Sequence, residues 1–466
     1  MRMMTPGKRH LPLVLWLDAL CLLIFLSLPP GIAQAQDPHG PFKFTKIDLE
    51  LLQQSNQADE EVTRKGLVFD DPAAAAYIEE IGMKVVPEAP LENVKWRFRI
   101  LRDPEPNAFA LPNGTIYVTS GLLALMQNEA QLAGTLGHEA THVNNRHSYL
   151  ENRSARKKMA TASVFAAIGG AASGGNGIAG IAIRSVVGRI IPSLIASTIF
   201  GYSRELEHEA DVYGLQAMAR NNYAPDQMGA VFETLKSGYE VDLAKEQHGL
   251  YTDHPRLDER IKYVNEMSET LKLQGEPVVR AAEYSRQMER VMRHDISLEI
   301  LTGRSRTAVG VAKRLTELNP DNAENFYWLG EAYRALGGRM FRPQAEELTD
   351  SAKNAARKQL GKMTIFEYEA SLRTTPQGKT VWAENVKLAE AAYGRSLALD
   401  PNYAKAICGQ ASLYDEDGRA AQALEGYRKY LELAPNAMDA YRVKKRVADL
   451  EKTAAVPAPT TTTSQN

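Results

Sequence analysis

The stretch from Asn128 to His147 constrains the fold of this chain more than any other, because it sets three chemically active side chains on one predicted helix. Apolar residues recur there at helical spacing, and an asparagine followed three residues later by a glutamine is typical of a helix start. His138 and His142 are one turn apart, so both imidazoles project from the same face, with Glu139 beside them.

Two imidazoles at this spacing can share one tetrahedral cation, and with the intervening glutamate they form the pattern of zinc proteases. A bound cation polarises a peptide carbonyl and acidifies a water, and Glu139 takes the proton as general base. The same residues also fall together by chance, on the order of once per hundred chains of this length. A third ligand must therefore be found elsewhere in the chain.

Composition places the chain among globular proteins of two or three domains. It has 466 residues, of which 44% are hydrophobic and 24% charged, and its formal net charge is -2. That charge gives no reason to expect nucleic acid as a partner. The cysteines are Cys21 and Cys408, and the first lies in the N-terminal apolar run, so neither an internal disulfide nor a thiolate zinc site is expected.

Residues 1–35 have a basic start, an apolar run from Leu11 to Leu28 and a small-residue end at Ala33-Gln-Ala35. This order predicts a secretory signal peptide cleaved after Ala35, and therefore export to the periplasm. The run is also close to the length that spans a bilayer, so an uncleaved membrane anchor remains the alternative.

The next elements are a helix from Pro72, capped by Asp71, and strands at 94–101 and 115–119. The strand at 115–119 leads toward the motif helix, and it is either an edge that binds an extended substrate or only a part of the sheet. Residues 159–183 carry no charge and are rich in Ala and Gly. Glycine makes a membrane span improbable, so we expect a mobile hairpin or flap over the cleft, with a membrane-surface or partner contact as the weaker option.

A second helical segment, from Tyr202 to Ala219, offers the missing ligand. Glu207 and Asp211 stand one turn apart on it, and a glutamate after a paired-histidine helix completes a catalytic zinc site. Asp211 could orient His138.

Other candidates near the site are less favoured. Glu205 is plausible by composition, and His208 lies about 100° round the helix from Glu207. His147, five residues past His142, is expected to be a solvated residue at the helix end.

These motifs together resemble a known family. His138-Glu-Ala-Thr-His142 with Ser203 to Asp211, Asn107-Ala-Phe109 and the strand at 115–119 is similar to the zinc endopeptidases that include the CAAX prenyl protease and HtpX-type membrane proteases. The resemblance implies a gluzincin-type domain, helical with a small β-sheet. It also implies one Zn²⁺ per chain, with His138, His142 and Glu207 as its ligands. Glu139 is implied as the catalytic base.

His254 precedes Pro255 and an arginine, which by itself is an ordinary helix start. The periplasmic branch of the family, the β-barrel assembly-enhancing proteases, has a similar histidine that can fill the open metal position. By resemblance His254 is a candidate regulatory fourth ligand, because a filled position prevents activation of water.

The C-terminal third has the period of tetratricopeptide repeats. Pro401 and Pro435, each closing a helical run, are 34 residues apart, and the run from Phe326 to Tyr333 matches the first helix of another repeat. The interval from Pro320 to Pro401 is longer, which predicts an insertion within 337–379. Stacked helix pairs leave a concave surface suited to a polypeptide.

The sequence thus predicts a mainly α protein: a metalloprotease domain followed by an α-solenoid. The expected boundaries are 1–35 signal peptide, 36–270 protease, 271–305 helical linker, 306–452 repeats and 453–466 disordered tail. The resemblance implies an exported metalloendopeptidase in outer-membrane protein assembly and quality control. Its expected partners are unfolded polypeptides, the outer-membrane assembly machinery through the repeats, and peripherally a membrane. The alternative is a repeat-based chaperone or adaptor with a structural or latent zinc site.

Overall fold

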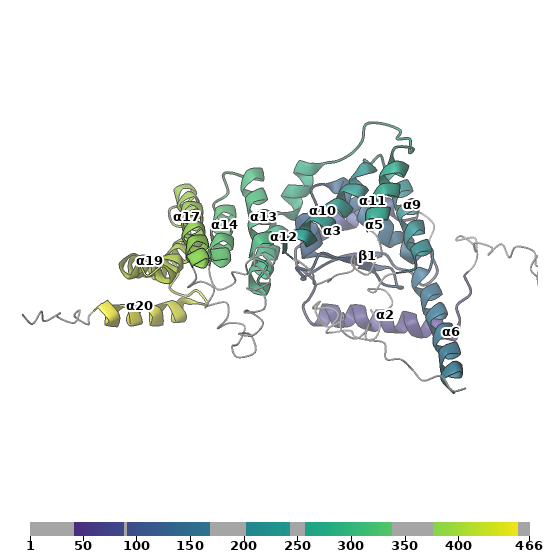
Figure 1. Cartoon of the computed structure of the whole chain (residues 1–466), viewed down its shortest axis with the longest axis horizontal. Coiled ribbons are helices and arrows are strands. Elements are labelled where there is room, and N and C mark those ends of the chain that lie inside the picture. Colours follow the sequence, from purple (N-terminus) through teal and green to yellow (C-terminus); the bar gives the residue numbers. More distant parts are fainter. Residues whose placement is uncertain (1–41, 88–90, 168–201, 243–256, 338–375, 455–466) are drawn as a thin grey trace, which may run out of the picture. The chain divides into compact units, whose positions relative to one another are not determined.

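The computed structural model describes residues 42–87, 91–167, 202–242, 257–337 and 376–454 (Figure 1). The chain divides after Phe44, and the elements below all belong to the unit that begins at Thr45. The predicted signal peptide or anchor and residues 455–466 of the predicted tail lie outside the described residues. Within the described ranges, no helix is both long and apolar enough to cross a membrane.

A small mixed sheet contains β1 (Arg97–Leu101), β2 (Ala108–Ala110) and β3 (Thr115–Thr119). β3 lies in the middle, parallel to β1 and antiparallel to β2. The interpretation of 115–119 as a substrate-binding edge is therefore wrong, because both of its sides are hydrogen-bonded within the sheet. Gly114 precedes β3 with a φ of 92°, a left-handed conformation that glycine adopts without strain.

Helices cover both faces of the sheet (Figure 1). α2 (Lys46–Arg64) lies on one face, where Asp59 accepts a hydrogen bond of 2.5 Å from the hydroxyl of Tyr117. α3 (Pro72–Val85) and α5 (Glu129–Asn144) pack against β1 and β2. The predicted start of α3 is confirmed, since the Asp71 side chain accepts hydrogen bonds from the first free backbone N–H groups.

α5 is the central helix of this half of the chain. Every residue from Glu129 to Val143 is buried, and α5 packs against α3, α9 and α10. The helices that complete this half are α4 (Ser120–Leu125), α6 (His147–Ala167), α9 (Arg204–Arg220), α10 (Asp226–Asp242) and α11 (Leu257–Ser268). The start of the predicted flap, 159–167, continues α6, and the remainder, 168–183, lies outside the described residues.

α12 (Ala281–Thr302) packs both on α3 and α4 and on the helices that follow. Its Tyr284 hydroxyl donates to the backbone oxygen of Leu123 in α4 at 2.6 Å. Within the predicted linker range 271–305, residues 281–302 thus form a helix with a buried face along most of its length.

Stacked helix pairs make up the C-terminal part, and the prediction of a tetratricopeptide solenoid is confirmed. Ala411, Ala423 and Tyr427 are buried between α18 and α19, and Gly418 turns the chain between these helices with a φ of 80°. α14 packs closely on α17, although residues 338–375 between them, where the insertion was predicted, lie outside the described residues. The elements are α13 (Ser305–Leu318), α14 (Ala323–Gly337), α17 (Pro376–Leu399), α18 (Ala404–Glu416), α19 (Ala420–Leu433) and α20 (Ala440–Ala454).

Candidate metal centre

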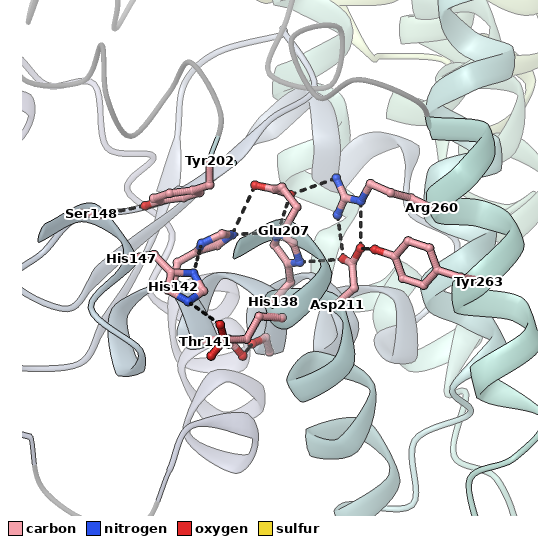
Figure 2. A network of polar contacts seen from close by, with 12 residues as sticks. His138, Thr141, His142, His147, Ser148, Tyr202, Glu207, Asp211, Arg260 and Tyr263 are labelled. Carbon is pink, nitrogen blue, oxygen red and sulfur yellow. Dashed lines mark hydrogen bonds and ion pairs between the residues drawn. The ribbon is translucent and has the colours of Figure 1, made fainter. Parts of the chain in front are cut away.

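The motif helix places its two histidines as the sequence predicts. The Asn128 side chain caps α5 by accepting the backbone N–H of Gln131 at 3.0 Å, which confirms the predicted start. His138 and His142 are both buried, and their Nε2 atoms lie 3.1 Å apart (Figure 2). The two Nε2 nitrogens therefore face a common point.

α9 brings Glu207 to that point. One carboxylate oxygen lies 3.5 Å from Nε2 of His138, and the other lies 3.7 Å from Nε2 of His142. The approach depends on two glycines where α5 and α9 touch. A Cβ atom at Gly214 would stand 3.1 Å from the backbone nitrogen of His138, and one at Gly137 would stand 3.3 Å from the Cα of Gly214. The helices thus meet backbone to backbone.

The donor set fits a divalent cation. One nitrogen of each histidine and one oxygen of Glu207 all lie within 4.8 Å of one another, and all three side chains are buried. Two imidazoles and a carboxylate are a set that zinc takes in catalytic sites. Three groups that direct lone pairs at one point repel one another unless a cation lies among them.

Asp211, one turn after Glu207, supports this cluster from behind. Its Oδ1 lies 2.8 Å from Nδ1 of His138. Arg260 of α11 donates two hydrogen bonds to the same carboxylate, at 2.7 and 2.9 Å, and Tyr263 donates its hydroxyl. Another guanidinium nitrogen of Arg260 lies 3.2 Å from Glu207 (Figure 2). The geometry therefore places Asp211 where it orients His138.

The charges of this cluster determine its protonation. Burial alone raises the pKa of Asp211, but Arg260 and His138 outweigh it and hold that pKa well below its usual range. Burial lowers the pKa of His138, yet the hydrogen bond to Asp211 and the nearby carboxylates outweigh it, so that pKa is raised. Asp211 is thus an ionised acceptor that keeps a proton on Nδ1 of His138.

Glu139 is buried next to these ligands. Burial raises its pKa to about 7, with the charge of Glu207 adding to the shift and that of His138 opposing it. A carboxylate whose pKa lies near neutrality can both take and return a proton, which suits a general base.

The prediction that His147 is a solvated residue is wrong, because its side chain is fully buried. α5 ends at Asn144, and Arg146 adopts a left-handed conformation with a φ of 59°, which turns the chain back so that His147 begins α6. Its Nδ1 lies 2.9 Å from Nδ1 of His142, and its Nε2 lies 3.6 Å from Glu209. A turn set by one backbone angle leaves no periodic signal in the sequence.

Two alternatives considered for the cluster lie apart from it. Glu205 and His208 are exposed, and the ring of His208 instead contacts Tyr263 edge-on, with centroids 4.7 Å apart. His254 lies outside the described residues. Sequence reasoning missed Arg260, whose only local signal is its position three residues before Tyr263 on one face of α11.

Comparison with known proteins agrees with this geometry. The sequence model of Peptidase family M48 matches residues 72–268. "Mitochondrial metalloendopeptidase OMA1" of Schizosaccharomyces pombe is 27% identical over 195 residues, which are 41% of this chain and 52% of that protein. "Putative beta-barrel assembly-enhancing protease" of Vibrio cholerae is 30% identical over 253 residues, 52% of this chain and 50% of that protein. The chain thus spans about half the length of these relatives.

Residues 72–268 are therefore similar in sequence to the domain of peptidase family M48. The chain is also similar to proteins named beta-barrel assembly-enhancing protease and to "Metalloprotease YcaL" of Escherichia coli. YcaL is 30% identical over 169 residues, 36% of this chain and 61% of that protein. The resemblance drawn from the sequence motifs is confirmed.

Proposed function

We propose that the chain is a zinc-dependent metalloendopeptidase in which His138, His142 and Glu207 hold the ion and Glu139 is the general base. The observation that carries the proposal is the convergence of three ligand atoms within 4.8 Å inside a family M48 domain. Glu207 lies on α9 and the two histidines lie on α5, so this distance depends on how the two helices pack and cannot be read from the spacing of the residues in the sequence.

The surrounding residues support peptide hydrolysis. A bound Zn²⁺ supplies a Lewis acid for the scissile carbonyl and increases the acidity of water. The carboxylate of Glu139 accepts a proton from the attacking water and then delivers it to the leaving amide nitrogen. Asp211 holds the proton of His138 on Nδ1, so the lone pair of His138 remains on Nε2, the nitrogen that faces Glu207. Arg260 keeps Asp211 ionised.

The biological setting is part of the proposal. Relatives named beta-barrel assembly-enhancing protease support a role in the bacterial envelope, and residues 1–35 read as an export signal. We propose that the periplasmic chain cleaves misfolded or unassembled envelope proteins. The repeat domain, with the proposed range 306–452, would bind these polypeptides or the outer-membrane assembly machinery.

Casein hydrolysis by the purified mature chain tests the activity, with Glu139→Gln beside it and zinc content measured in both. We expect cleavage by the wild type only and about one Zn²⁺ per chain in each, because the substitution removes the base and retains the ligands. If neither the wild type nor Glu139→Gln cleaves casein although both contain zinc, His254→Ala is assayed next. This variant is expected to cleave casein if His254 fills the open metal position in the wild type.

The helical repeats favour one second candidate, a chaperone or assembly adaptor with a structural zinc. Zinc binding without hydrolysis in any of these three forms, together with suppression of casein aggregation, would establish that function instead. N-terminal sequencing of the exported chain separates a cleaved signal from an anchor, because cleavage gives a chain that starts at Gln36.

A further inference from the structure

His142 has a partner on the side away from the ligand cluster, as His138 does. We infer that His147, held by Glu209, positions His142 as a metal ligand by keeping the proton of His142 on Nδ1 and fixing its ring. The inference rests on the proposed function, since it concerns the same metal site.

The contacts lead from half-buried Glu209 on α9 through buried His147 to buried His142 on α5. Nδ1 of His147 lies 2.9 Å from Nδ1 of His142, while Nε2 of His142 faces the ligand cluster (Figure 2). Nε2 of His147 lies 3.6 Å from Oε2 of Glu209, so the carboxylate faces this nitrogen at slightly more than hydrogen-bond distance. Asn145 donates its side-chain amide to the other oxygen of Glu209 at 2.5 Å, which fixes the carboxylate.

These contacts determine which ring nitrogens of His142 and His147 carry a proton. Two Nδ1 atoms at 2.9 Å share one proton, so one ring donates and the other accepts. A carboxylate oxygen of Glu209 faces Nε2 of His147 and favours a proton on that nitrogen, because a protonated ring nitrogen attracts the oxygen and a bare one repels it. Nδ1 of His147 is then the acceptor and Nδ1 of His142 the donor. The lone pair of His142 is consequently on Nε2, where it meets Glu207 and His138.

Packing restrains the same ring. Tyr202 stacks on His142 with ring centroids 3.8 Å apart and planes 16° apart, and its hydroxyl lies 2.8 Å from that of Ser148. The two ligand histidines are thus oriented by different groups: a carboxylate holds His138, and an imidazole backed by a carboxylate holds His142.

The test is the zinc dissociation constant of the full chain, measured by competition with a chromophoric chelator. His147→Leu removes the acceptor and is expected to weaken zinc binding about 10- to 100-fold. His147→Asn restores it to within about threefold of the wild type, because its side-chain oxygen can occupy the place of Nδ1. Glu209→Gln removes the charge that selects the tautomer and is expected to weaken binding about tenfold.

Ser55→Ala is the control for the loss of a buried hydroxyl away from the site. The Ser55 hydroxyl donates to the backbone oxygen of Leu51 in α2 at 2.9 Å, and the variant is expected to bind zinc within about twofold of the wild type. Thermal unfolding of the chelator-treated variants separates positioning from folding, because a structural role lowers the midpoint of His147→Asn as much as that of His147→Leu.

Each outcome decides something. Equal zinc affinity in His147→Leu and the wild type would overturn the inference, and so would equal losses in His147→Leu and His147→Asn. If His147→Leu fails to fold, Glu209→Gln decides, and unchanged affinity in that variant overturns it. A wild-type chain that binds no zinc contradicts the proposed function itself, which is a different failure.

Discussion

Arg260 joins the two acidic residues that α9 contributes to the site. Its guanidinium pairs with Asp211 and Glu207, and it lies 4.4 Å from the ring centroid of Phe232 in α10. Asp211 is completely buried, so its charge depends on partners inside the protein. Arg260 is therefore as much a part of the folded core as of the site.

Arg260→Met is expected to lower the free energy of unfolding of the chelator-treated chain by about 3–5 kcal/mol, because it leaves a buried carboxylate without its cation. Urea unfolding measures the change. Arg286→Met is the control: Arg286 is exposed and pairs with neighbouring Glu283, so a change within about 0.5 kcal/mol is expected. A loss below 1 kcal/mol at Arg260 would contradict this account.

Sequence reasoning found the residues whose signal is local. His138, His142 and Glu139 follow from helical spacing, and Glu207 from a resemblance carried by its own helix. His147 and Arg260 were misjudged or missed because their roles arise from a left-handed turn and from the packing of α11, which act between distant residues. The order of the strands escaped prediction for the same reason, since pairing depends on tertiary contacts.

At the scale of elements, the contact between α5 and α9 sets the ligand distances. Gly214→Ala places a methyl group about 3.1 Å from the backbone of His138, so one helix must shift by a few tenths of an ångström. We expect weaker zinc binding and a loss of about 1–3 kcal/mol in unfolding free energy. Gly310→Ala in α13, where a Cβ meets nothing within 4 Å, should instead stabilise by about 0.5–1 kcal/mol. Chelator competition and urea unfolding check both, and unchanged zinc affinity in Gly214→Ala would contradict the role of this contact.

The contact between α12 and α4 contains a buried acid. The Asp295 carboxyl lies 2.9 Å from the Ser120 hydroxyl, which in turn lies 3.0 Å from the backbone oxygen of Asp103. Burial raises the pKa of Asp295 from its ordinary 3.8 to about 7, with Ser120 and Arg304 opposing the shift. The folded state therefore keeps a proton that the unfolded state releases, and stability falls as pH rises from about 4 to about 7.

Asp295→Asn removes this dependence, because an amide can donate to Ser120 without titrating. The gain in unfolding free energy is expected to be about 2 kcal/mol larger at pH 8 than at pH 5. Urea unfolding at both pH values measures it. An equal change at the two pH values would show that Asp295 is ionised in the folded chain.

At the scale of the whole molecule, α12 packs both on α3 and α4 of the protease half and on α13 and α14 of the repeats. Five of its apolar side chains are completely buried, and together they contribute roughly 10 kcal/mol, which matches the net stability of a domain. These are Tyr284, Met288, Val291, Met292 and Ile296.

A fragment of residues 36–270 is therefore expected to unfold without a cooperative transition, whereas residues 36–337, which retain α12 to α14, unfold cooperatively. Circular dichroism during heating distinguishes them. A sharp transition in the shorter fragment would mean that α4 and α3 do not need α12.

The glycine contact between α5 and α9 also has a meaning for engineering. Because no side chain stands between α5 and α9 at this contact, the residues at positions 137 and 214 determine the distance between the two helices. Substitutions at Gly137 and Gly214 are therefore the first to test for changing the size of the cation that the site prefers, with the ligands themselves unchanged.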